Sequence, residues 1–504
     1  MAVVPDPIPR PLDHLAEIGA DGDPALILRE EVITHHDLRT RVARIAAWLR
    51  DQGLVQGARV ASWMGKGELA CILPLACARA GLVYVPINPL LKRHQVAHIV
   101  ADCGANVLIS NSGRISTLDQ CDILDSCQII EGDTVISASA AGAGDVSPSQ
   151  HDAGTLASIL YTSGSTGRPK GVMLSHANLW LGAVSVATYL RLAPDDRTLA
   201  VLPLSFDYGQ NQLFSTWYAG GAAIPLDYLT PRDVIKACAR HGVTTLAAVP
   251  PLWVQLVEQD WPDAAVSSMR RLTNSGGALT EDLVALLRRQ FPQADLYPMY
   301  GLTEAFRSTF LDPGKVDTHP TSMGTAIPFA EILVIDDEGN LAGPGEEGEL
   351  VHCGPLVAQG YWGDAGRTAE RFRPAPPMSQ YGGTAVWSGD RVTRDAQGLL
   401  YFVGRRDAMI KSAGNRISPT EIEEAALATG LVREAVAMGV ADERLGQAIH
   451  LVVRGSGTET EIRAALKKDL PNFMQPSVIR FVDAMPLNPN GKIDRTRLQM
   501  EAAA

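Results

Sequence analysis

A run of hydroxyl residues and glycines that ends in a lysine offers the clearest chemistry in this chain. Residues 161–171 read Tyr-Thr-Ser-Gly-Ser-Thr-Gly-Arg-Pro-Lys-Gly. Glycines let the backbone turn without Cβ clashes, so that amide groups and hydroxyls can converge on an anion, and Lys170 adds a cation. The pattern predicts a phosphate-binding loop that is not a Walker loop, because Gly-x4-Gly-Lys-Ser/Thr is absent. The predicted binding residues are Thr162, Ser163, Gly164, Ser165, Thr166 and Gly167.

The segments on either side of this loop have the pattern of elements that would hold it in place. Residues 156–160, Leu-Ala-Ser-Ile-Leu, have the length and apolarity of a buried strand. Ser175 could cap a helix that starts at His176. An ordinary turn rich in serine and glycine is the alternative. The density of hydroxyl residues favours the phosphate loop.

Strand-like and helix-like segments alternate ahead of the loop and predict an α/β fold. Residues 59–63, 81–86 and 105–110 are typical of strands, and residues 69–78 and 92–102 are typical of helices. Such alternation implies stacked, mostly parallel sheets covered by helices. Residues 137–154 are small and polar, and we expect them to form a surface linker before the loop.

Composition narrows the possible classes of function. The 504 residues, 46% hydrophobic and 20% charged, are typical of a globular protein with more than one domain. The net charge of −12 argues against a surface for nucleic acid or for an anionic membrane. The seven cysteines show no CxxC spacing, so we expect neither a zinc site nor a disulfide framework. The chain starts without a signal-sequence pattern, and its most apolar stretch is far shorter than the ~20 residues that span a bilayer, which predicts a cytoplasmic protein.

Later motifs, taken with the loop, resemble one family along nearly the whole chain. These are Asn-Ser-Gly-Gly-Ala at residues 274–278, Met-Tyr-Gly-Leu-Thr-Glu at 299–304, Gly389-Asp390, and Pro-Leu-Asn-Pro-Asn-Gly-Lys at 486–492. Their types and order are similar to those of the adenylate-forming superfamily, which contains acyl-CoA synthetases, stand-alone adenylation enzymes and luciferases. The resemblance implies that a carboxylate is activated with ATP as an acyl-AMP, and that pyrophosphate is released.

The resemblance also implies roles for the residues around the phosphates. Lys170 and the loop would hold the triphosphate, and Thr303 would donate to the α-phosphate. Glu304 would bind Mg2+ through hard oxygen ligands, with Thr166 as a second ligand. Lys492 would reach the reacting carboxylate and α-phosphate, although a solvated lysine is the ordinary explanation of a lone lysine. Residues 299–304 could instead form a helix cap.

A second group of residues would bind the adenosine, again by resemblance. Tyr300 and Gly301 would line the adenine, together with the turn formed by Ser275, Gly276, Gly277 and Ala278. Asp390 would bind both ribose hydroxyls and would share the ribose with Arg405. Asp390 follows Trp-Ser-Gly where the family usually has Arg-Thr-Gly, and a Gly-Asp pair alone is a weak signal.

The family pattern divides the chain into a large N-terminal core, residues 1–403, and a small mobile α+β lid, residues 404–504. Asp407 occupies the position of the family's hinge, and residues 411–416 resemble the loop presented to a pantetheine thiol. Within the lid we expect helices at residues 419–429 and 459–469 and strands near 434–440 and 448–454. The lid would turn between adenylate formation and thioester formation.

Two charged residues suggest the type of acid. Phe206-Asp207 resembles the pair found in amino-acid-adenylating enzymes, where the aspartate binds the substrate ammonium; a helix-capping aspartate is the alternative. Arg307, three residues after Glu304, would lie one helical turn deeper and could bind a second carboxylate, helped by Ser275, unless it pairs with a structural acid. These residues favour a small amino or dicarboxylic acid over a long fatty acid.

The amino-acid sequences of residues 201–209, 273–278 and 300–307 look like those of bacterial AMP-forming ligases linked to exosortase systems. The resemblance therefore predicts an acid–thiol ligase that uses ATP and Mg2+. The acceptor would be CoA or the phosphopantetheine of a separate carrier protein, since no carrier domain follows residue 504, and the enzyme would be a monomer or homodimer. The alternatives are a luciferase-like oxygenase that uses the adenylate, and a nucleotide-binding protein without turnover.

Overall fold

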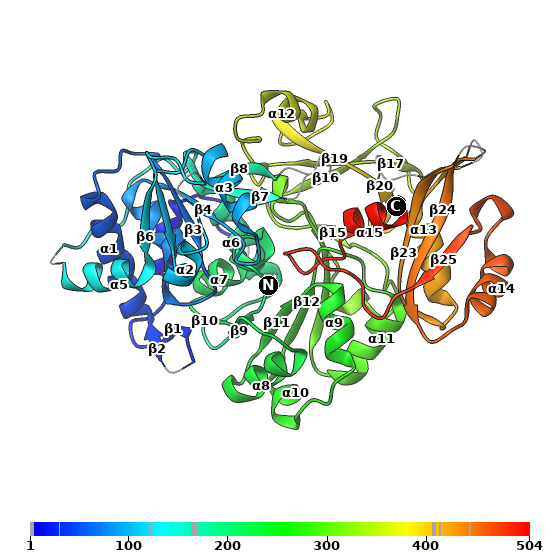
Figure 1. Cartoon of the computed structure of the whole chain (residues 1–504), viewed down its shortest axis with the longest axis horizontal. Helices are drawn as coiled ribbons and strands as arrows, with labels where there is room; N and C mark the ends of the chain where they lie inside the picture. Colours follow the sequence, from blue (N-terminus) through cyan, green and yellow to red (C-terminus); the bar gives the residue numbers. More distant parts are fainter. Residues whose placement is uncertain are drawn as a thin grey trace.

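The computed structural model describes residues 5–29, 31–119, 122–142, 144–162, 169–405, 410–412, 415–442 and 445–503. Within these ranges the strands form four sheets, which Figure 1 shows in chain order from blue through green and yellow to red. The predicted fold class, a large α/β part with mostly parallel sheets followed by a small α+β part, is confirmed. The division between residues 403 and 404 stays a prediction.

The first sheet is parallel except at the edge where the predicted phosphate loop lies. Its strands run in the order β6 (Gln128–Glu131), β5 (Val107–Ser110), β3 (Arg59–Trp63), β4 (Val83–Pro86), β7 (Leu156–Thr162) and β8 (Lys170–Ser175), with β8 antiparallel to β7. Both β4 and β5 are buried at every residue, as parallel strands under helices are. The helices of this part are η1 (Leu12–Glu17), α1 (His35–Asp51), α2 (Glu68–Ala80), α3 (Arg93–Asp102), α4 (Ser112–Ile115) and α5 (Gly132–Ala141). None of the described helices is long and apolar enough to cross a membrane.

The expected linker at residues 137–154 is partly wrong. Its first five residues belong to α5, because alanine favours the helix and Ser139 packs inward with Val135. Ser149 is also buried, and its amide and hydroxyl donate to the Asp13 carboxylate at 3.0 and 2.6 Å. The segment is therefore attached to the N-terminal 3-10 helix and is not a free surface linker.

The second sheet carries most of the candidate site at one end of its strands. Its order is β15 (Thr325–Ala326), β14 (Thr309–Phe310), β13 (Asp295–Tyr300), β12 (Arg271–Asn274), β11 (Thr245–Ala248), β9 (Arg197–Ala200), β10 (Ala222–Pro225), β1 (Pro24–Ile27) and β2 (Val32–Thr34). From β13 to β1 the neighbours are parallel. Residues that follow the carboxyl ends of parallel strands meet at one edge, where α/β sheets bind ligands. Ser275 and Gly301 directly follow β12 and β13.

Helices pack on this sheet and fix the segments between its strands. They are α6 (His176–Tyr189), α7 (Asp207–Tyr218), α8 (Pro231–His241), α9 (Pro250–Val257), α10 (Asp263–Ser268) and α11 (Glu281–Gln290), with the 3-10 turns η2 (Thr303–Ala305) and η3 (Pro313–Lys315). The predicted cap of α6 is confirmed, because the Ser175 hydroxyl accepts from the amide of Asn178. The α6 and α7 helices are buried over most of their residues and contact each other closely.

The last two sheets are mainly antiparallel. The third contains β16 (Glu331–Ile335), β17 (Glu347–Cys353), β18 (Phe372–Pro374), β19 (Thr384–Arg394) and β20 (Leu400–Arg405), beside α12 (Ala365–Arg371). The fourth contains β21 (Ile410–Ser412), β22 (Asn415–Ile417), β23 (Val432–Asp442), β24 (Gly446–Gly455) and β25 (Val478–Phe481), with α13 (Pro419–Ala428), α14 (Glu459–Asp469), η4 (Asn472–Met474) and α15 (Arg495–Ala503). The helix predicted at residues 459–469 is confirmed to the residue. After β25 the chain, red in Figure 1, runs back toward the second sheet before α15.

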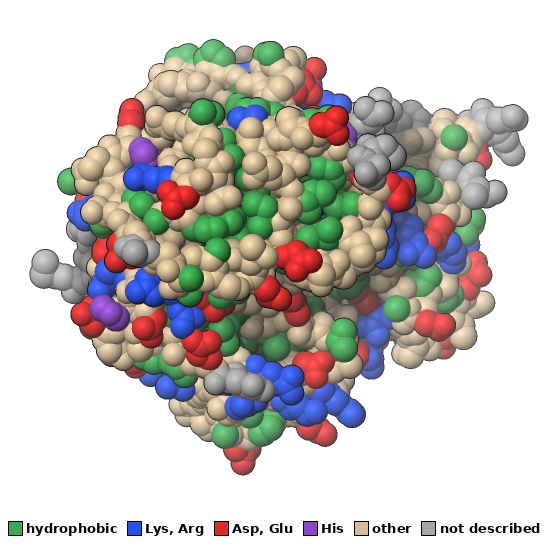
Figure 2. Space-filling view, turned by 60° about the vertical axis from the view of Figure 1, so that its left-hand side comes forward, with side chains coloured by type: hydrophobic (Ala, Val, Ile, Leu, Met, Phe, Trp, Pro, Cys, Tyr) green, Lys and Arg blue, Asp and Glu red, His purple; other side chains and the backbone are tan. Residues whose placement is uncertain are grey.

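Acidic and basic residues are intermixed on the face of the molecule drawn in Figure 2, where Asp and Glu side chains stand among Lys and Arg side chains. On this face the effect of the net charge of −12 at a particular site therefore depends on local partners.

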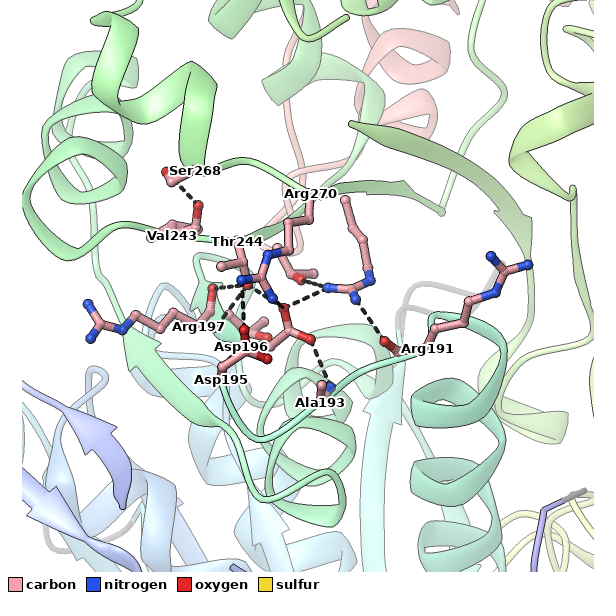
Figure 3. A network of polar contacts seen from close by, with 12 residues as sticks. Arg191, Ala193, Asp195, Asp196, Arg197, Val243, Thr244, Ser268 and Arg270 are labelled. Carbon is pink, nitrogen blue, oxygen red and sulfur yellow. Dashed lines mark hydrogen bonds and ion pairs between the residues drawn. The ribbon is translucent and has the colours of Figure 1, made fainter. Parts of the chain in front are cut away.

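A buried ion-pair network fixes the amino ends of the parallel strands in the second sheet (Figure 3). The Asp196 carboxylate accepts from the Arg271 guanidinium at 2.7 Å and from the Thr244 hydroxyl at 2.8 Å. It also accepts from the amide of Ala193 at 2.8 Å, and Arg270 approaches it at 3.3 Å. These residues begin or precede β9, β11 and β12. The network lies at the strand ends opposite the candidate site.

We expect Asp196→Ala to destabilise the protein by about 3–5 kcal/mol, because it leaves buried guanidinium charge without a partner. Denaturant unfolding with a constant m-value measures this loss. The matched control is Asp195→Ala, which removes the exposed partner of Arg270 and should cost less than about 1 kcal/mol. Equal losses in the two variants would contradict a special role for the buried pair.

Candidate active site

Lys170, Glu304 and Tyr361 form a charged cluster where the first two sheets meet. The Lys170 ammonium lies 3.1 Å from Oε1 of Glu304 and donates to the Tyr361 hydroxyl at 2.7 Å. The same hydroxyl donates to Oε1 of Glu304 at 2.6 Å. Lys170 begins β8, Glu304 lies in η2, and Tyr361 follows β17, so three distant segments supply the cluster.

The cluster keeps Glu304 ionised although it is buried. Burial alone would raise the pKa of the Glu304 carboxyl, but the charge of Lys170 and the hydrogen bond from Tyr361 hold it below its usual value. The negative charge of Glu304 in turn adds to burial in raising the pKa of Tyr361, so this phenol stays a neutral donor. An ionised carboxylate beside an ammonium suits a site for phosphate oxygens and a hard metal ion.

Asp207 and Thr303 form a second polar contact close to the first. The Thr303 hydroxyl donates to Oδ1 of Asp207 at 2.9 Å, and both residues are buried. Burial raises the pKa of Asp207, although the charges of Arg307 and Lys492 oppose this. Phe206, not Asp207, is the N-cap of α7, so the helix-capping alternative for Asp207 is wrong, as is the capping alternative for Thr303.

Lys492 reaches this position on a tight loop that returns from the C-terminal part. Asn488 organises the loop: its amide donates to the Lys492 carbonyl at 2.7 Å, and its side chain accepts from the Lys492 amide at 3.1 Å. Asn88 after β4 donates to the Pro489 carbonyl at 2.8 Å and fixes the loop on the N-terminal part. The ammonium lies 4.6 Å from the centre of the Phe206 ring.

The Lys492 side chain occupies the space that Gly276 leaves open. A Cβ at Gly276 would come within 2.5 Å of Lys492 Cε, and the residue has a φ of +83° that favours glycine. Burial lowers the pKa of Lys492, Asp207 opposes this shift, and Arg307 adds to it. The sequence therefore needs glycine here so that a lysine from the other end of the chain can enter.

Tyr300, Asp390 and Arg405 meet at the third sheet. The Tyr300 hydroxyl donates to Asp390, and Arg405 Nε lies 3.2 Å from Oδ1 of Asp390. Burial and the charge of Asp390 raise the pKa of Tyr300 well above its usual value, so this group is also a neutral donor. Asp390 and Arg405 pair in register across β19 and β20. An aromatic ring beside a carboxylate can hold a base and a sugar diol.

The turn after β12 lies between these groups and the second sheet. Ser275, Gly276, Gly277 and Ala278 follow one another here, and the Asn274 amide closes the turn by donating to the Gly277 carbonyl at 2.8 Å. Gly301 directly follows β13 and cannot carry a side chain, because a Cβ there would lie 2.9 Å from the Phe306 carbonyl oxygen.

Arg307 reaches the interior by a route that the sequence analysis did not predict. It was expected one helical turn beyond Glu304, but η2 ends at Ala305 and Phe306 adopts φ +62°. This backbone conformation is unfavourable for a bulky residue and reverses the chain. Arg307 then donates to the Ser275 hydroxyl at 2.7 Å, and its guanidinium lies 4.5 Å from the centre of the Tyr208 ring.

Part of the predicted phosphate loop lies outside the described residues. Thr162 ends β7 and pairs with Lys170 across the hairpin, and its hydroxyl is buried without a partner among the described residues. Ser163, Gly164, Ser165, Thr166 and Gly167 are outside the described ranges, as is the predicted hinge residue Asp407. The described ends of the loop nevertheless place Lys170 beside Glu304.

Tyr361 is the residue that the sequence analysis missed. It follows Gly360 in the run Gln-Gly-Tyr-Trp, where the only local signal is a pair of aromatic residues after a glycine. An aromatic residue in such a position is more often part of a core. Its contact with both Lys170 and Glu304 depends on pairing with β8, which sequence spacing does not reveal.

The arrangement can bind and polarise a phosphorylated nucleotide next to a small acid. Positive groups from β8 and from the C-terminal loop lie near carboxylates that can hold a metal ion or a sugar, and Arg307 lines a small, mainly apolar cavity. Such a set neutralises developing negative charge during group transfer.

Two family models match the chain. The model of the AMP-binding enzyme matches residues 16–362, and the model of the AMP-binding enzyme C-terminal domain matches residues 421–492. Among curated proteins, a feruloyl-CoA synthase from an Amycolatopsis species is 32% identical over 477 residues, which are 92% of either chain. Tyrocidine synthase 2 of Brevibacillus parabrevis is 29% identical over 94% of this chain, which spans only 13% of that protein's length.

Solved structures agree in fold over nearly the whole chain. ATP-bound MatB from Rhodopseudomonas palustris has a TM-score of 0.87 and 26% identity, and the match covers 98% of this chain and 99% of that one. The o-succinylbenzoate CoA synthetase MenE from Bacillus subtilis, in complex with the acyl-adenylate OSB-AMP, has a TM-score of 0.84 and 25% identity over 98% of either chain.

The lowered pKa of Glu304 predicts a pH-dependent effect of Lys170→Met. Without the Lys170 ammonium, the effect of burial on Glu304 is no longer offset by that positive charge, and the pKa of Glu304 rises. The variant therefore loses stability at neutral pH. The deficit should shrink as the pH falls through both pKa values, because the carboxyl is then protonated in either protein. Thermal unfolding from about pH 8 to pH 4 tests this sign.

Glu304→Gln provides the control background for this experiment. With the carboxyl absent, Lys170→Met should produce a stability change that does not vary with pH over the same interval. A deficit that stays constant in the natural background would contradict the proposed coupling of Lys170 and Glu304.

Proposed function

The chain belongs to the AMP-binding enzyme family, and from this premise we propose that it is an AMP-forming acid–thiol ligase. It activates a carboxylic acid with ATP as an acyl-AMP, releases pyrophosphate, and transfers the acyl group to a pantetheine thiol. Feruloyl-CoA synthase and the CoA synthetase MenE are relatives whose names describe this type of product. The finer resemblance to ligases linked to exosortase systems stays a prediction.

One observation carries the proposal: two lysines from distant parts of the chain enter one site that also holds carboxylates. Lys170 is fixed against Glu304, and Lys492 enters over Gly276 beside Phe206 and Asp207. Attack of a carboxylate on the α-phosphorus brings two negative groups together, so it requires cations held in place before reaction. A protein that only bound a nucleotide would not need a second lysine beside the acid cavity.

The roles follow from these positions. Lys492 binds the reacting carboxylate and the α-phosphate, and Thr303 orients the same oxygens once its hydroxyl leaves Asp207. Lys170 binds the outer phosphates together with the loop that begins at Thr162. Tyr361 holds the Glu304 carboxylate when the Lys170 ammonium turns to phosphate, because its hydroxyl donates to Glu304 independently.

The described residues fit ATP and Mg2+. The buried hydroxyl of Thr162, at the end of β7 where the predicted phosphate loop begins, has no partner among the described residues. Gly277 and Ala278, in the turn after β12, are exposed and leave room for close approach. Tyr300 and Ala278 would contact the adenine, and Asp390 with Arg405 would hold the ribose. Glu304, with Thr166 as predicted, would hold Mg2+, which supplies charge neutralisation at the phosphate oxygens.

The acceptor is CoA or the phosphopantetheine of a carrier protein. Residues 411–416 would face the thiol after the C-terminal part turns about Asp407, as the family pattern implies. Formation of a thioester from supplied CoA or carrier protein would exclude a luciferase-like oxygenase as the sole activity. Absence of any ATP-dependent turnover would favour the nucleotide-binding alternative.

The acid is small and polar, with an amino group or a second carboxylate. Asp207 is buried next to the ammonium of Lys492, so a substrate ammonium could lie beside it while the substrate carboxylate meets Lys492. Arg307 lies beyond Ser275 and could meet a second anionic group. ATP–pyrophosphate exchange with amino, dicarboxylic and fatty acids, added singly, tests the function and the class together.

We expect Lys492→Ala to reduce ATP–pyrophosphate exchange by about 100-fold or more, because it removes a preorganised cation from the reacting oxygens. Thioester formation from supplied acyl-AMP should be largely retained, since that step no longer involves pyrophosphate release. Lys468→Ala, an exposed lysine on α14, is the control and should alter neither reaction. Equal loss of both half-reactions would contradict the role of Lys492.

Asp207→Ala should lower kcat/KM selectively for acids that carry an α-amino group, by about 30-fold or more, because a buried charge partner is lost. Asp207→Asn separates charge from structure, since the amide can still accept from Thr303. The ratio of amino to plain acids, measured by pyrophosphate exchange, should fall in both variants. An unchanged ratio would remove Asp207 from the substrate pocket.

A further inference from the structure

We propose that the deep end of the acid pocket is a seat for a second carboxylate of the substrate, formed by Arg307 with Asn211 and Gln212 of α7. The inference rests on the proposed function, since it assigns the class of acid that the same site activates. It goes further by committing to a short dicarboxylic acid, with or without an amino group, and by naming the groups that bind its distal end.

Arg307 differs from the other deeply buried arginines of the described chain in having no carboxylate partner there. Arg79 is 1% exposed and pairs with Asp13 and Glu17, and Arg271 is 9% exposed and pairs with Asp196. Arg307 is 2% exposed, and no described carboxylate lies within ion-pair distance of it. Its polar contacts among the described residues include the neutral hydroxyls of Ser275 and Tyr189, and its guanidinium lies over the rings of Tyr208 and Phe306. A buried guanidinium without an anion is costly, so an anion that arrives with the substrate completes it.

Asp207 is influenced by the charge of Arg307, but the two side chains form no ion pair. Asp207 instead accepts from Thr303 at 2.9 Å and is also influenced by the charge of Lys492. Neither Asp207 nor Lys492 lines the small cavity that Arg307 lines. The two cations therefore serve different groups in this proposal, Lys492 the reacting carboxylate and Arg307 the distal one.

The α7 helix presents a polar stripe to the same cavity. Tyr208, Asn211, Gln212 and Ser215 recur at helical spacing and line the cavity together with Arg307. Asn211 and Gln212 are 3% and 5% exposed. Among the described residues, Nδ2 of Asn211, both amide atoms of Gln212 and Nε of Arg307 lack hydrogen-bond partners. Buried polar atoms are normally paired, so this set indicates a polar ligand group.

The chemistry of the set favours a carboxylate over a neutral group. Arg307, Asn211 and Gln212 all line one cavity and carry N–H groups without partners among the described residues, and the guanidinium supplies positive charge. A carboxylate has acceptor sites for several donors and compensates the charge, whereas a carboxamide would leave the charge uncompensated. The remaining Gln212 oxygen can accept from a water or from an amino group of the substrate.

The walls of the cavity restrict the length of the acid. Val186, Tyr189 and Met299 line it, and its volume of about 20 Å³ is room for a single water molecule. The Tyr189 hydroxyl donates to the Met299 sulfur at 2.9 Å in this wall. A long acyl chain would have to displace packed side chains, whereas one carboxylate fits after small adjustments.

The first test measures ATP–pyrophosphate exchange by the full-length enzyme with short dicarboxylic acids and with acids that lack the second carboxylate. Succinate, glutarate, aspartate and glutamate are the dicarboxylic probes; butyrate, asparagine, glutamine and octanoate are the comparison acids. We expect a dicarboxylic acid to exceed its neutral counterpart in kcat/KM by about 100-fold, as loss of a partner to a buried charge implies. Octanoate should give no exchange.

The outcomes separate this inference from the proposed function. Exchange with neutral acids at the level of the dicarboxylic acids would overturn the carboxylate seat, while the ligase function would stand. Exchange with none of the acids, in enzyme shown to be folded and to bind ATP, would overturn the ligase function and the seat with it.

The second test substitutes the residues that form the proposed carboxylate seat. Arg307→Gln should reverse the preference, lowering the ratio of dicarboxylic to neutral acid by about 100-fold, and Arg307→Lys should restore part of it because charge returns. Gln212→Leu should lower the same ratio less. The matched control is Gln210→Leu, since Gln210 is equally buried on α7 with unpartnered amide atoms but does not line the cavity.

Thermal unfolding of every variant identifies any that lose the fold, and the ratio within one variant cancels a general loss of activity. A ratio that stays constant in Arg307→Gln, or an equal shift in Gln210→Leu, would overturn the assignment of the seat.

Discussion

The candidate site depends on compensating charge away from bulk water. Glu304 is buried and ionised because Lys170 and Tyr361 compensate its charge. Lys492 is buried as well, and the opposite charge of Asp207 partly offsets the effect of that burial. Removing a charged group from water is costly unless an opposite charge or several hydrogen bonds replace the solvent. The structure meets this cost with groups from β8, η2, α7 and the C-terminal loop, so the site exists only when these elements are assembled.

Close approach of backbone segments is the second requirement of the site. Gly276 gives Lys492 its path, Gly301 allows the chain to pass beside Phe306, and Phe306 itself turns with positive φ so that Arg307 points inward. Gly182 on α6 makes room for the Phe306 ring, since a Cβ there would lie 2.7 Å from it. Strain at Phe306 persists because packing on every side determines its position.

The same parallel strands serve stability at one end and chemistry at the other. Asp196 and Arg271 fix the amino ends of β9 and β12, far along the strands from Ser275 and Gly301 at the carboxyl ends. The polar residues near the carboxyl ends are partly unpaired, whereas the Asp196 carboxylate at the amino ends accepts hydrogen bonds on both oxygens. The large buried core beneath α6 and α7 holds both ends in register.

The sequence by itself determined the α/β class, most element positions, the family, and the charged residues Lys170, Glu304 and Lys492 that the structure brings into one region. These follow from local patterns: apolar periodicity, caps such as Ser175, and short motifs in a fixed order. It did not determine that residues 137–141 are helical, that Tyr361 joins Lys170 to Glu304, or that Arg307 is reached through a reversed backbone rather than a helix. Those features depend on contacts between segments tens to hundreds of residues apart, whose distances local spacing does not encode. Only the tertiary structure decided which buried charges are paired, and that Arg307 has no carboxylate partner among the described residues.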